Sequence, residues 1–300
     1  MPQHTTNTLR FTKGHGTKND FVLLFDEHGQ TAMTPELVRY LCDRRGGIGG
    51  DGVIRAVRAG ALLAGKGFDA NTWFMDYWNS DGSTSEMCGN GARVFAAILE
   101  REAGLDLRGG LTFGTRGGAR TVTALGSDQN GDAMYAVGMG EFRLGRAPEG
   151  FDSEVSAHGL DAIRPSLSVD VGNPHHVVAL AHVGELEALD LSVAPAVHPV
   201  APNGSNVEFV VTLGGEILDG VERGRIRMRV HERGSGETMS CGTGACAAAL
   251  AVRFWAGPEA PDVWDVEVPG GLVTARVRGN HVTLEGPAVL VADGTVSIPA

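Results

Sequence analysis

Met87-Cys88-Gly89-Asn90-Gly91-Ala92 has a near copy in the same chain, Ser240-Cys241-Gly242-Thr243-Gly244-Ala245. Each stretch follows a polar loop rich in glycine and serine, and each leads into an alanine-rich apolar segment. The two cysteines are 241 − 88 = 153 residues apart, and a second pair of similar positions, Asn19 and Asn173, is 173 − 19 = 154 residues apart. Two registers that agree this closely predict an internal repeat, and therefore a chain built from two homologous halves.

Both halves are predicted to combine short strands with a few helices. Short apolar runs between glycine turns predict strands, for example at Phe21–Phe25 and Ala61–Leu63. Helices are predicted over Gly89–Glu102 and about Gly242–Trp255, because apolar residues follow each cysteine motif at helical spacing. The stretch Gly126–Asp132 has the composition of a linker, and we place a domain boundary there. The sequence therefore predicts two α+β domains, with the active site in the interdomain cleft.

Composition and charge argue against several classes of function. Lys+Arg 25 against Asp+Glu 36 gives a net charge of −11, which disfavours a surface for nucleic acid or anionic membrane. No stretch approaches the ~18 consecutive apolar residues of a membrane helix, and Met1–Arg10 is polar without a signal-peptide core. Four cysteines are too few for a disulfide scaffold in 300 residues. We expect a cytoplasmic protein with no nucleic-acid or membrane partner.

The repeated Cys-Gly-x-Gly motifs predict a pair of reactive thiols. Each motif lies where a polar loop enters a helix, so several backbone N–H groups point outward and can bind a carboxylate. The same helix end is expected to lower the pKa of the thiol. Two such halves that face each other would bracket a single carbon, with one thiolate removing an α-proton and the opposite thiol delivering one. That is the chemistry of a two-base racemase or epimerase.

The other cysteines and the cofactor-like motifs have simpler interpretations. Cys42 and Cys246 are expected to be small buried apolar residues. Cys241 and Cys246 fall on different faces of a helix, and the chain has no Cys-x-x-Cys, so we expect no metal site. Gly47–Gly52 matches Gly-x-Gly-x-x-Gly but follows a predicted helix rather than a strand, and none of the three lysines suits pyridoxal phosphate. We therefore expect no cofactor, and a disulfide between the repeated cysteines only as an inactive oxidation product.

At this point the motifs resemble those of the diaminopimelate epimerase family. The two cysteine motifs carry the resemblance, as Met87–Arg93 and as Glu232–Ala245. Further matches run in order over nearly the whole chain and are jointly specific; they are Asn19-Asp20-Phe21, Gly47–Gly52, Asn79–Ser83, Asn173-Pro174-His175, Asn206–Phe209, Pro269-Gly270-Gly271 and Gly286-Pro287-Ala288.

The resemblance implies a fold of two pseudo-symmetric homologous domains of mixed β-sheet around a central helix. The last strand returns to the first domain, so the halves are 1–131 plus 287–300, with Cys88, and 132–286, with Cys241. It also implies a cofactor-independent isomerase that interconverts LL- and meso-2,6-diaminopimelate in lysine and peptidoglycan precursor biosynthesis. A homodimer is implied as well.

The resemblance assigns roles to matching positions. Cys88 and Cys241 would be the acid/base pair, and His175 and Glu232 would tune the pKa values of the thiols. Backbone groups would hold the carboxylate of the reacting centre at Gly89, Asn90, Gly242 and Thr243. Amide and charged side chains suit the zwitterionic distal end of the substrate, and they would be Asn19, Asn79, Asn173, Asn206, Glu232 and Arg233.

Two positions depart from the family pattern. Lys18 stands where the family usually has glycine, and is expected to strain the turn or to add a cation near the cleft. Gly52 stands where some members have a substrate-binding glutamine, and can make no side-chain contact. Two alternatives stay open. A proline or hydroxyproline racemase would carry histidine at the position of Asn90, and a non-catalytic amino-acid-binding protein would be expected to lack one of the two cysteines.

Overall fold

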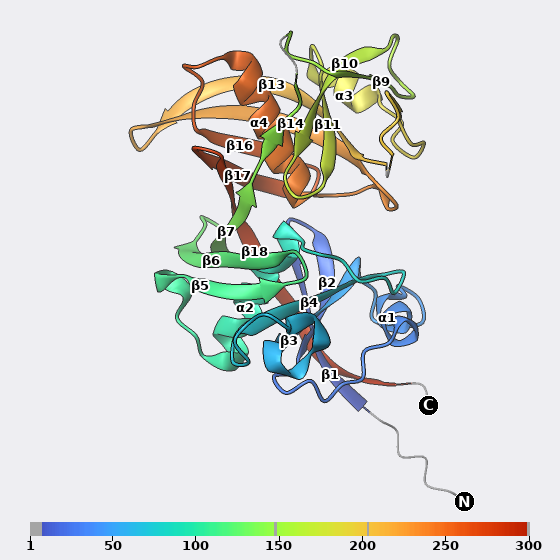
Figure 1. The fold of residues 1–300 in the computed structure, drawn as a ribbon, viewed down its shortest axis with the longest axis vertical. Helices are drawn as coiled ribbons and strands as arrows, with labels where there is room; N and C mark the ends of the chain where they lie inside the picture. The colour runs from blue at the N-terminus through green and yellow to red at the C-terminus, as the bar shows by residue number, and fades with distance from the viewer. Residues whose placement is uncertain (1–7, 147–148, 203, 299–300) are drawn as a thin grey trace, which may run out of the picture. The chain divides into compact units, whose positions relative to one another are not determined.

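The structure is a computed structural model that describes residues 8–146, 149–202 and 204–298. The chain divides into two compact units (Figure 1), of which the first ends at Val137 and resumes at Pro287 and the second is Gly138–Gly286. The sequence places its boundary six residues earlier, at 131/132. The ends of the expected first half, residues 1–7 and 299–300, lie outside the described residues.

The first unit is built from strands that pair in chain order, with one long helix. Its elements are β1 (Thr8–Gly16), β2 (Asn19–Phe25), α1 (Pro35–Cys42), β3 (Gly52–Arg58), the 3-10 turns η1 (Ala59–Ala61) and η2 (Leu63–Gly65), β4 (Trp73–Asn79), α2 (Gly89–Ala103), the 3-10 turn η3 (Leu107–Gly109), β5 (Leu111–Thr115), β6 (Gly118–Ser127) and β7 (Ala133–Glu141). The last strand of the chain, β18 (His281–Ser297), starts in the second unit and ends in the first.

The second unit repeats this plan with four additional short strands, β8, β9, β12 and β15. Its elements are β8 (Arg143–Leu144), β9 (Ser153–Ser156), β10 (Arg164–Asp170), β11 (Pro174–Ala179), α3 (Val183–Ala188), β12 (Ala196–His198), β13 (Asn206–Leu218), β14 (Val221–Glu232), β15 (Gly236–Glu237), α4 (Gly242–Ala256), β16 (Val263–Val268) and β17 (Gly271–Arg278).

The strand pairings show the repeat directly. In the first unit β1–β2 is antiparallel, β2–β3 parallel, β3–β4 antiparallel, β4–β5 parallel, and β5–β6 and β6–β7 antiparallel. The second unit has the same order of pairings in β10–β11, β11–β13, β13–β14, β14–β16, β16–β17 and β17–β18. The expected fold class, two units of mixed sheet that each contain a central helix, is confirmed.

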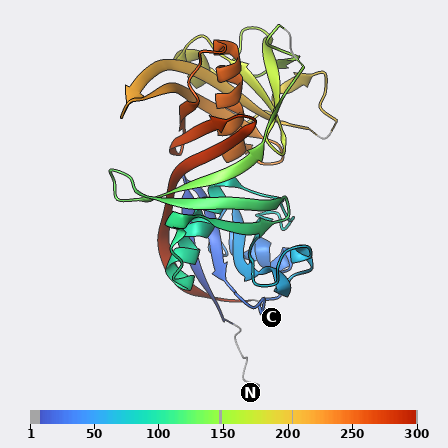
Figure 2. The same cartoon turned by 60° about the vertical axis from the view of Figure 1, so that its left-hand side comes forward.

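The long helix of each unit is buried on all sides. Every residue of α2 from Gly89 to Leu99 is buried, and so is every residue of α4 from Gly244 to Val252. A helix that is apolar all round belongs inside a core. Here α2 packs on β1, β2, β3, β4 and β6, and α4 packs on β10, β11, β13, β14, β16 and β17, as Figures 1 and 2 show. The start of each helix is therefore fixed by its own sheet.

Two local predictions were wrong. The predicted strand at Ala61–Leu63 is replaced by η1 and η2, in which Leu62 and Gly65 donate backbone hydrogen bonds three residues back, to Ala59 and Leu62. The predicted linker is the loop of a β-hairpin, since β6 and β7 pair antiparallel on either side of it, from Val122 with Val137 to Ser127 with Ala133. Linker and hairpin loop have the same polar, glycine-rich composition because both avoid regular structure.

Candidate functional site

The two repeated cysteines are the N-cap residues of the two central helices. α2 begins at Gly89 and α4 at Gly242, which are 153 residues apart, as the cysteines are. In each helix the N–H of the third residue donates to the cap sulfur, at 3.4 Å from Gly91 to Cys88 Sγ and at 3.3 Å from Gly244 to Cys241 Sγ. The repeat in the sequence is therefore a repeat in the position of a thiol at a helix start.

Amide side chains surround Cys88. Its thiol donates to Asn19 Oδ1 at 3.6 Å, and Asn90 Nδ2 donates to the same oxygen at 3.2 Å. Asn19 is held in turn by Asp51, whose Oδ2 accepts from Asn19 Nδ2 at 2.8 Å. Gly89 lies between Cys88 and Asn90 at the helix start. The structure thus brings together four predicted residues of the first half, and adds Asp51, for which no role was predicted.

Asn79 lies at the end of β4 and is engaged in its own turn. Its Nδ2 donates to Ser83 Oγ at 3.0 Å, and its described contacts do not include the group around Cys88. Asn79 pairs with Gly52 across β3 and β4. A Cβ at Gly52 would clash with the carbonyl oxygen of Trp78, so a glutamine could not stand there without moving the strands.

Cys241 lies in a drier and more acidic environment. It is 5% exposed, and its Sγ is 3.5 Å from Thr243 Oγ1. Burial raises the pKa of the Cys241 thiol well above its ordinary value, and the carboxylates of Glu232 and Glu208 raise it further. The bonds from Thr243 and Gly244 oppose this but are smaller effects. The expectation that the helix start acidifies this thiol is therefore wrong, because burial outweighs the helix end, and Cys241 is held in the protonated form.

Glu232 lies next to this thiol at the end of β14. It accepts a short hydrogen bond from Thr238 Oγ1 and hydrogen-bonds with Cys241. Burial raises the pKa of the Glu232 carboxyl, and the Thr238 and Cys241 bonds offset part of that effect. The neighbouring residue, Arg233, donates its backbone N–H to Asn206 Oδ1 at 2.9 Å.

His175 connects the remaining predicted residues of the second half. Its Nε2 lies 2.9 Å from Asn173 Oδ1, and its Nδ1 lies 3.5 Å from Asn206 Nδ2. Its Nδ1 also lies 2.7 Å from Oε1 of Glu208, a residue that the sequence analysis did not single out. A signal was present, because Glu208 is the one charged residue in the apolar run Val207–Val211. His176, the next residue, faces away and lies 2.8 Å from Ser153 Oγ.

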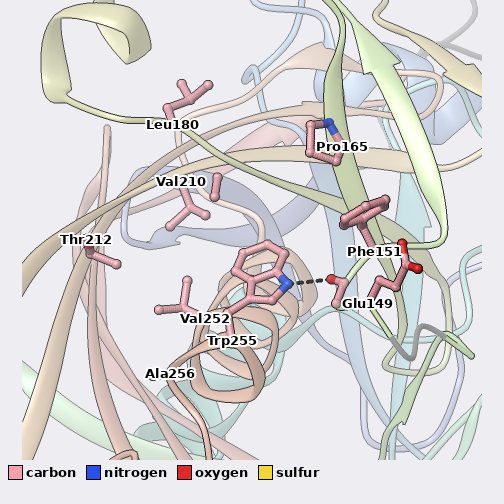
Figure 3. Close-up of a pocket in the computed structure, with 11 residues that line it drawn as sticks. Glu149, Phe151, Pro165, Leu180, Val210, Thr212, Val252, Trp255 and Ala256 are labelled. Carbon is pink, nitrogen blue, oxygen red and sulfur yellow. Dashed lines mark hydrogen bonds between the residues drawn. The ribbon is translucent and has the colours of Figure 1, made fainter.

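A cavity of the second unit is separate from these residues. It has a volume of about 460 Å³ and an apolar lining that includes Phe151, Leu180, Val210 and Trp255 (Figure 3). None of the predicted site residues is among the described residues that line it. The cavity lies at the C-terminal end of α4, whereas Cys241 caps the N-terminal end of the same helix. The two ends of a helix of this length are roughly 20 Å apart.

The described residues form neither a cluster of metal ligands nor a membrane-spanning helix. Within 8–146, 149–202 and 204–298, no three His, Cys, Asp or Glu side chains gather in a way that could hold a metal ion. In the same described ranges, the helices are too short or too polar to cross a bilayer.

Comparisons with known proteins give consistent results. The family model described as diaminopimelate epimerase matches residues 11–144 and 167–291. Proteins named diaminopimelate epimerase from Rhodococcus jostii and Streptomyces coelicolor are 44% and 46% identical to this chain. The alignments cover 96% and 95% of this chain and 97% and 94% of theirs.

Solved structures show the same fold at low sequence identity. A phenazine biosynthesis protein of the PhzF family from Bacillus anthracis aligns with a TM-score of 0.72 at 16% identity, over 97% of this chain and 100% of its own. A hydroxyproline epimerase from Agrobacterium vitis aligns with a TM-score of 0.62 at 13% identity, over 98% and 94%. At such identities the likeness concerns the fold alone.

Proposed function

The chain belongs to the diaminopimelate epimerase family, and from that membership we propose how its own residues carry out the reaction. As a member it is an isomerase that epimerises diaminopimelate, a step of lysine biosynthesis. We propose that it interconverts the LL and meso forms without a cofactor, with Cys88 and Cys241 as the two catalytic residues. One observation carries the proposal: both cysteines cap the central helix of topologically equivalent units.

The proposed reaction consists of two proton transfers on opposite faces of one α-carbon. A thiolate takes the α-hydrogen, so that an S–H bond forms and the C–H electron pair stays on the carbon. The thiol of the other cysteine then gives its proton to the opposite face, and becomes the thiolate. Because Cys241 is held protonated, we assign it as the proton donor of the resting enzyme and Cys88 as the base. After one turnover the two sulfurs have exchanged roles, which suits the reverse reaction.

The helix starts supply the electrostatic part of the proposal. The first N–H groups of a helix have no partner within it, and at Gly89, Asn90, Gly242 and Thr243 they would bind the carboxylate of the reacting centre. This carboxylate carries part of the negative charge of the carbanion, so donors aimed at it stabilise the transition state. His175 and Glu232 would adjust the pKa values of the thiols.

Six polar side chains would recognise the distal end of the substrate. That end carries an ammonium and a carboxylate, which call for both acceptors and donors. The proposed side chains are Asn19, Asn79, Asn173, Asn206, Glu232 and Arg233.

Isotope incorporation tests the two-base scheme. LL-diaminopimelate is incubated with the enzyme in deuterated water, and the meso product is analysed by mass spectrometry and NMR. We expect one deuterium at the inverted α-carbon, because the proton comes from a thiol that has exchanged with solvent. Inversion with retention of the original hydrogen would overturn the scheme. L-Proline serves as the control substrate, and its racemisation in place of diaminopimelate would overturn the assigned specificity.

We also propose that the protein acts as a cytoplasmic homodimer whose halves, 1–131 plus 287–300 and 132–286, each supply one cysteine. The four cysteines form no disulfide bonds, and a reducing compartment keeps cysteines in that state. Light scattering at low concentration should give twice the mass of one chain. A single-chain mass for the active enzyme would rule out the dimer.

A further inference from the structure

Glu208 is buried at a position where a carboxylate costs free energy. It lies on β13, and its side chain and that of His175 are both 0% exposed. Its Oε1 lies 2.7 Å from His175 Nδ1, and its Oε2 is buried with no hydrogen-bond partner in the described part of the chain. A buried carboxylate oxygen without a donor is destabilising. Stability alone therefore does not account for this residue.

The two ring nitrogens of His175 both face oxygen atoms. Nδ1 faces the carboxylate of Glu208, and Nε2 faces Oδ1 of Asn173 at 2.9 Å. With Glu208 ionised, both contacts are hydrogen bonds at once only when both nitrogens carry a hydrogen, as in the imidazolium ion. Glu208 then supplies the negative charge that a buried imidazolium requires.

The start of α4 makes room for this carboxylate. A Cβ placed on Gly244 would lie 2.7 Å from Glu208 Oε1 and 3.2 Å from Cys241 Sγ. The carboxylate oxygen and the sulfur are therefore no farther apart than the sum of these two distances. The positive end of a helix favours an anion there. The other titratable groups near the pair are Glu232 on β14 and His176 on β11, whose ring bonds Ser153 instead.

We propose that Glu208 is a positioning residue for the epimerisation, and that it acts through His175. Its carboxylate fixes the imidazole ring and keeps a hydrogen on both ring nitrogens, so that His175 presents a cation that stabilises the thiolate which Cys241 becomes once it has given up its proton. The inference rests on the proposed function, in which His175 tunes a thiol.

The first test uses the free enzyme and needs no activity. In wild-type protein labelled with 15N at histidine, His175 is assigned by its absence from a His175→Asn variant. We expect both ring nitrogens to carry hydrogen at neutral pH, with a strongly deshielded Nδ1 proton. We expect that proton signal to be lost in Glu208→Gln. A neutral His175 in the wild type, or an unchanged ring in Glu208→Gln, would overturn the proposal. The wild-type spectrum decides even if the variant does not fold.

The second test is a double-mutant cycle in kcat. Glu208→Gln should lower kcat about 10- to 100-fold with KM nearly unchanged, and should shift the pH profile of kcat. In a His175→Asn background, Glu208→Gln should lower kcat no further, because the residue through which Glu208 acts is gone. Additive losses would overturn the proposal.

Asp265→Asn is the matched control. Asp265 is a buried carboxylate of the same unit, 7% exposed and paired with Arg223 at 3.1 Å. We expect this change to lower stability and to leave the pH profile in place, and a shift equal to that of Glu208→Gln would count against the proposal. If the wild type fails the deuterium test but His175 is charged in the spectrum, the reaction scheme fails and the Glu208–His175 pair stands.

Discussion

Cys88 and Cys241 cap equivalent helices but lie in different electrostatic environments. Cys88 is half-buried among the amides of Asn19 and Asn90. Cys241 is buried, and the carboxylates of Glu232 and Glu208 raise the pKa of its thiol. A two-base reaction needs one thiolate and one thiol at the same time, and this asymmetry can provide it. The repeat in the sequence hides the difference, because Glu208 on β13 and Glu232 on β14 both lie outside the repeated Cys-Gly-x-Gly stretch.

Removal of either thiol should abolish epimerisation. Cys88→Ala and Cys241→Ala should each lower kcat by about 10²- to 10⁴-fold or more, since each removes a proton-transfer group. Cys42→Ala is the control: burial raises the pKa of the Cys42 thiol to about 12, and the residue packs in the apolar cluster under α1. Its kcat should stay near that of the wild type. Near-normal turnover in either of the first two variants would remove that cysteine from the mechanism.

Glu232→Gln should stabilise the protein at neutral pH while it impairs catalysis. Burial raises the pKa of Glu232 in the folded state above its ordinary value of 4.5. As the pH rises from that value through the folded pKa, the folded protein holds more protons than the unfolded one, so its stability falls. The glutamine variant lacks this loss. The difference in Tm between variant and wild type should therefore grow from about pH 4 to about pH 8. A Tm difference that does not change with pH would contradict a raised pKa for Glu232.

Lys18, which departs from the family pattern, lies in a strained position in the turn between β1 and β2. Thr17 and Lys18 have φ values of 51° and 61°, and Gly16 pairs with Asn19 across the hairpin. Such a two-residue turn needs positive φ at both central positions. A lysine side chain disfavours that region, and a glycine does not.

Lys18→Gly should therefore stabilise the first unit. Relief of the left-handed conformation is worth about 1–2 kcal/mol, and the added freedom of the unfolded chain removes part of it, so we expect a gain of roughly 0.5–1 kcal/mol. Urea unfolding measures the change. Lys66→Gly is the control, because Lys66 has a φ of −59° and gains nothing from glycine. Equal gains in stability from Lys18→Gly and Lys66→Gly would show that the backbone of Lys18 is not strained.

Helices with clear ends could be predicted from the sequence, and short apolar runs could not. The predicted helices Gly89–Glu102 and Gly242–Trp255 each end one residue short of the observed α2 and α4. Their starts are marked by a cap and glycines, and their ends by a following glycine. The run Ala61–Leu63 has no such marks and too few residues to show a period, and its Leu63 is 96% exposed. Tertiary context decides such a segment.

At the scale of the molecule, the repeat was visible in the sequence and the long-range partners were not. Cysteine and asparagine registers revealed two equivalent units because spacing survives in a linear sequence. The pair of His175 and Glu208 joins residues 33 apart on the parallel strands β11 and β13. Only the register of that pairing places the carboxylate on the ring. The same limit applies to Asp51, which reaches Asn19 across 32 positions.

Arg93 tests how the first unit is held together over long sequence distances. Its side chain is fully buried, and it donates to Pro287 O on β18 at 3.0 Å and to Thr17 Oγ1 in the β1–β2 turn at 3.1 Å. It also donates to Asn90 Oδ1 at 3.0 Å, and so supports the start of α2.

A lysine at position 93 keeps the charge but lacks the planar fork that serves these acceptors together. Arg93→Lys should therefore lower the free energy of unfolding by about 2–4 kcal/mol. Arg101→Lys on the same helix is the control, since Arg101 is partly exposed and pairs with Asp293 of β18 at 2.7 Å. Arg101→Lys should lower the free energy of unfolding by less than about 1 kcal/mol. Equal losses in urea unfolding of the two variants would show that Arg93 does not join these segments as the contacts indicate.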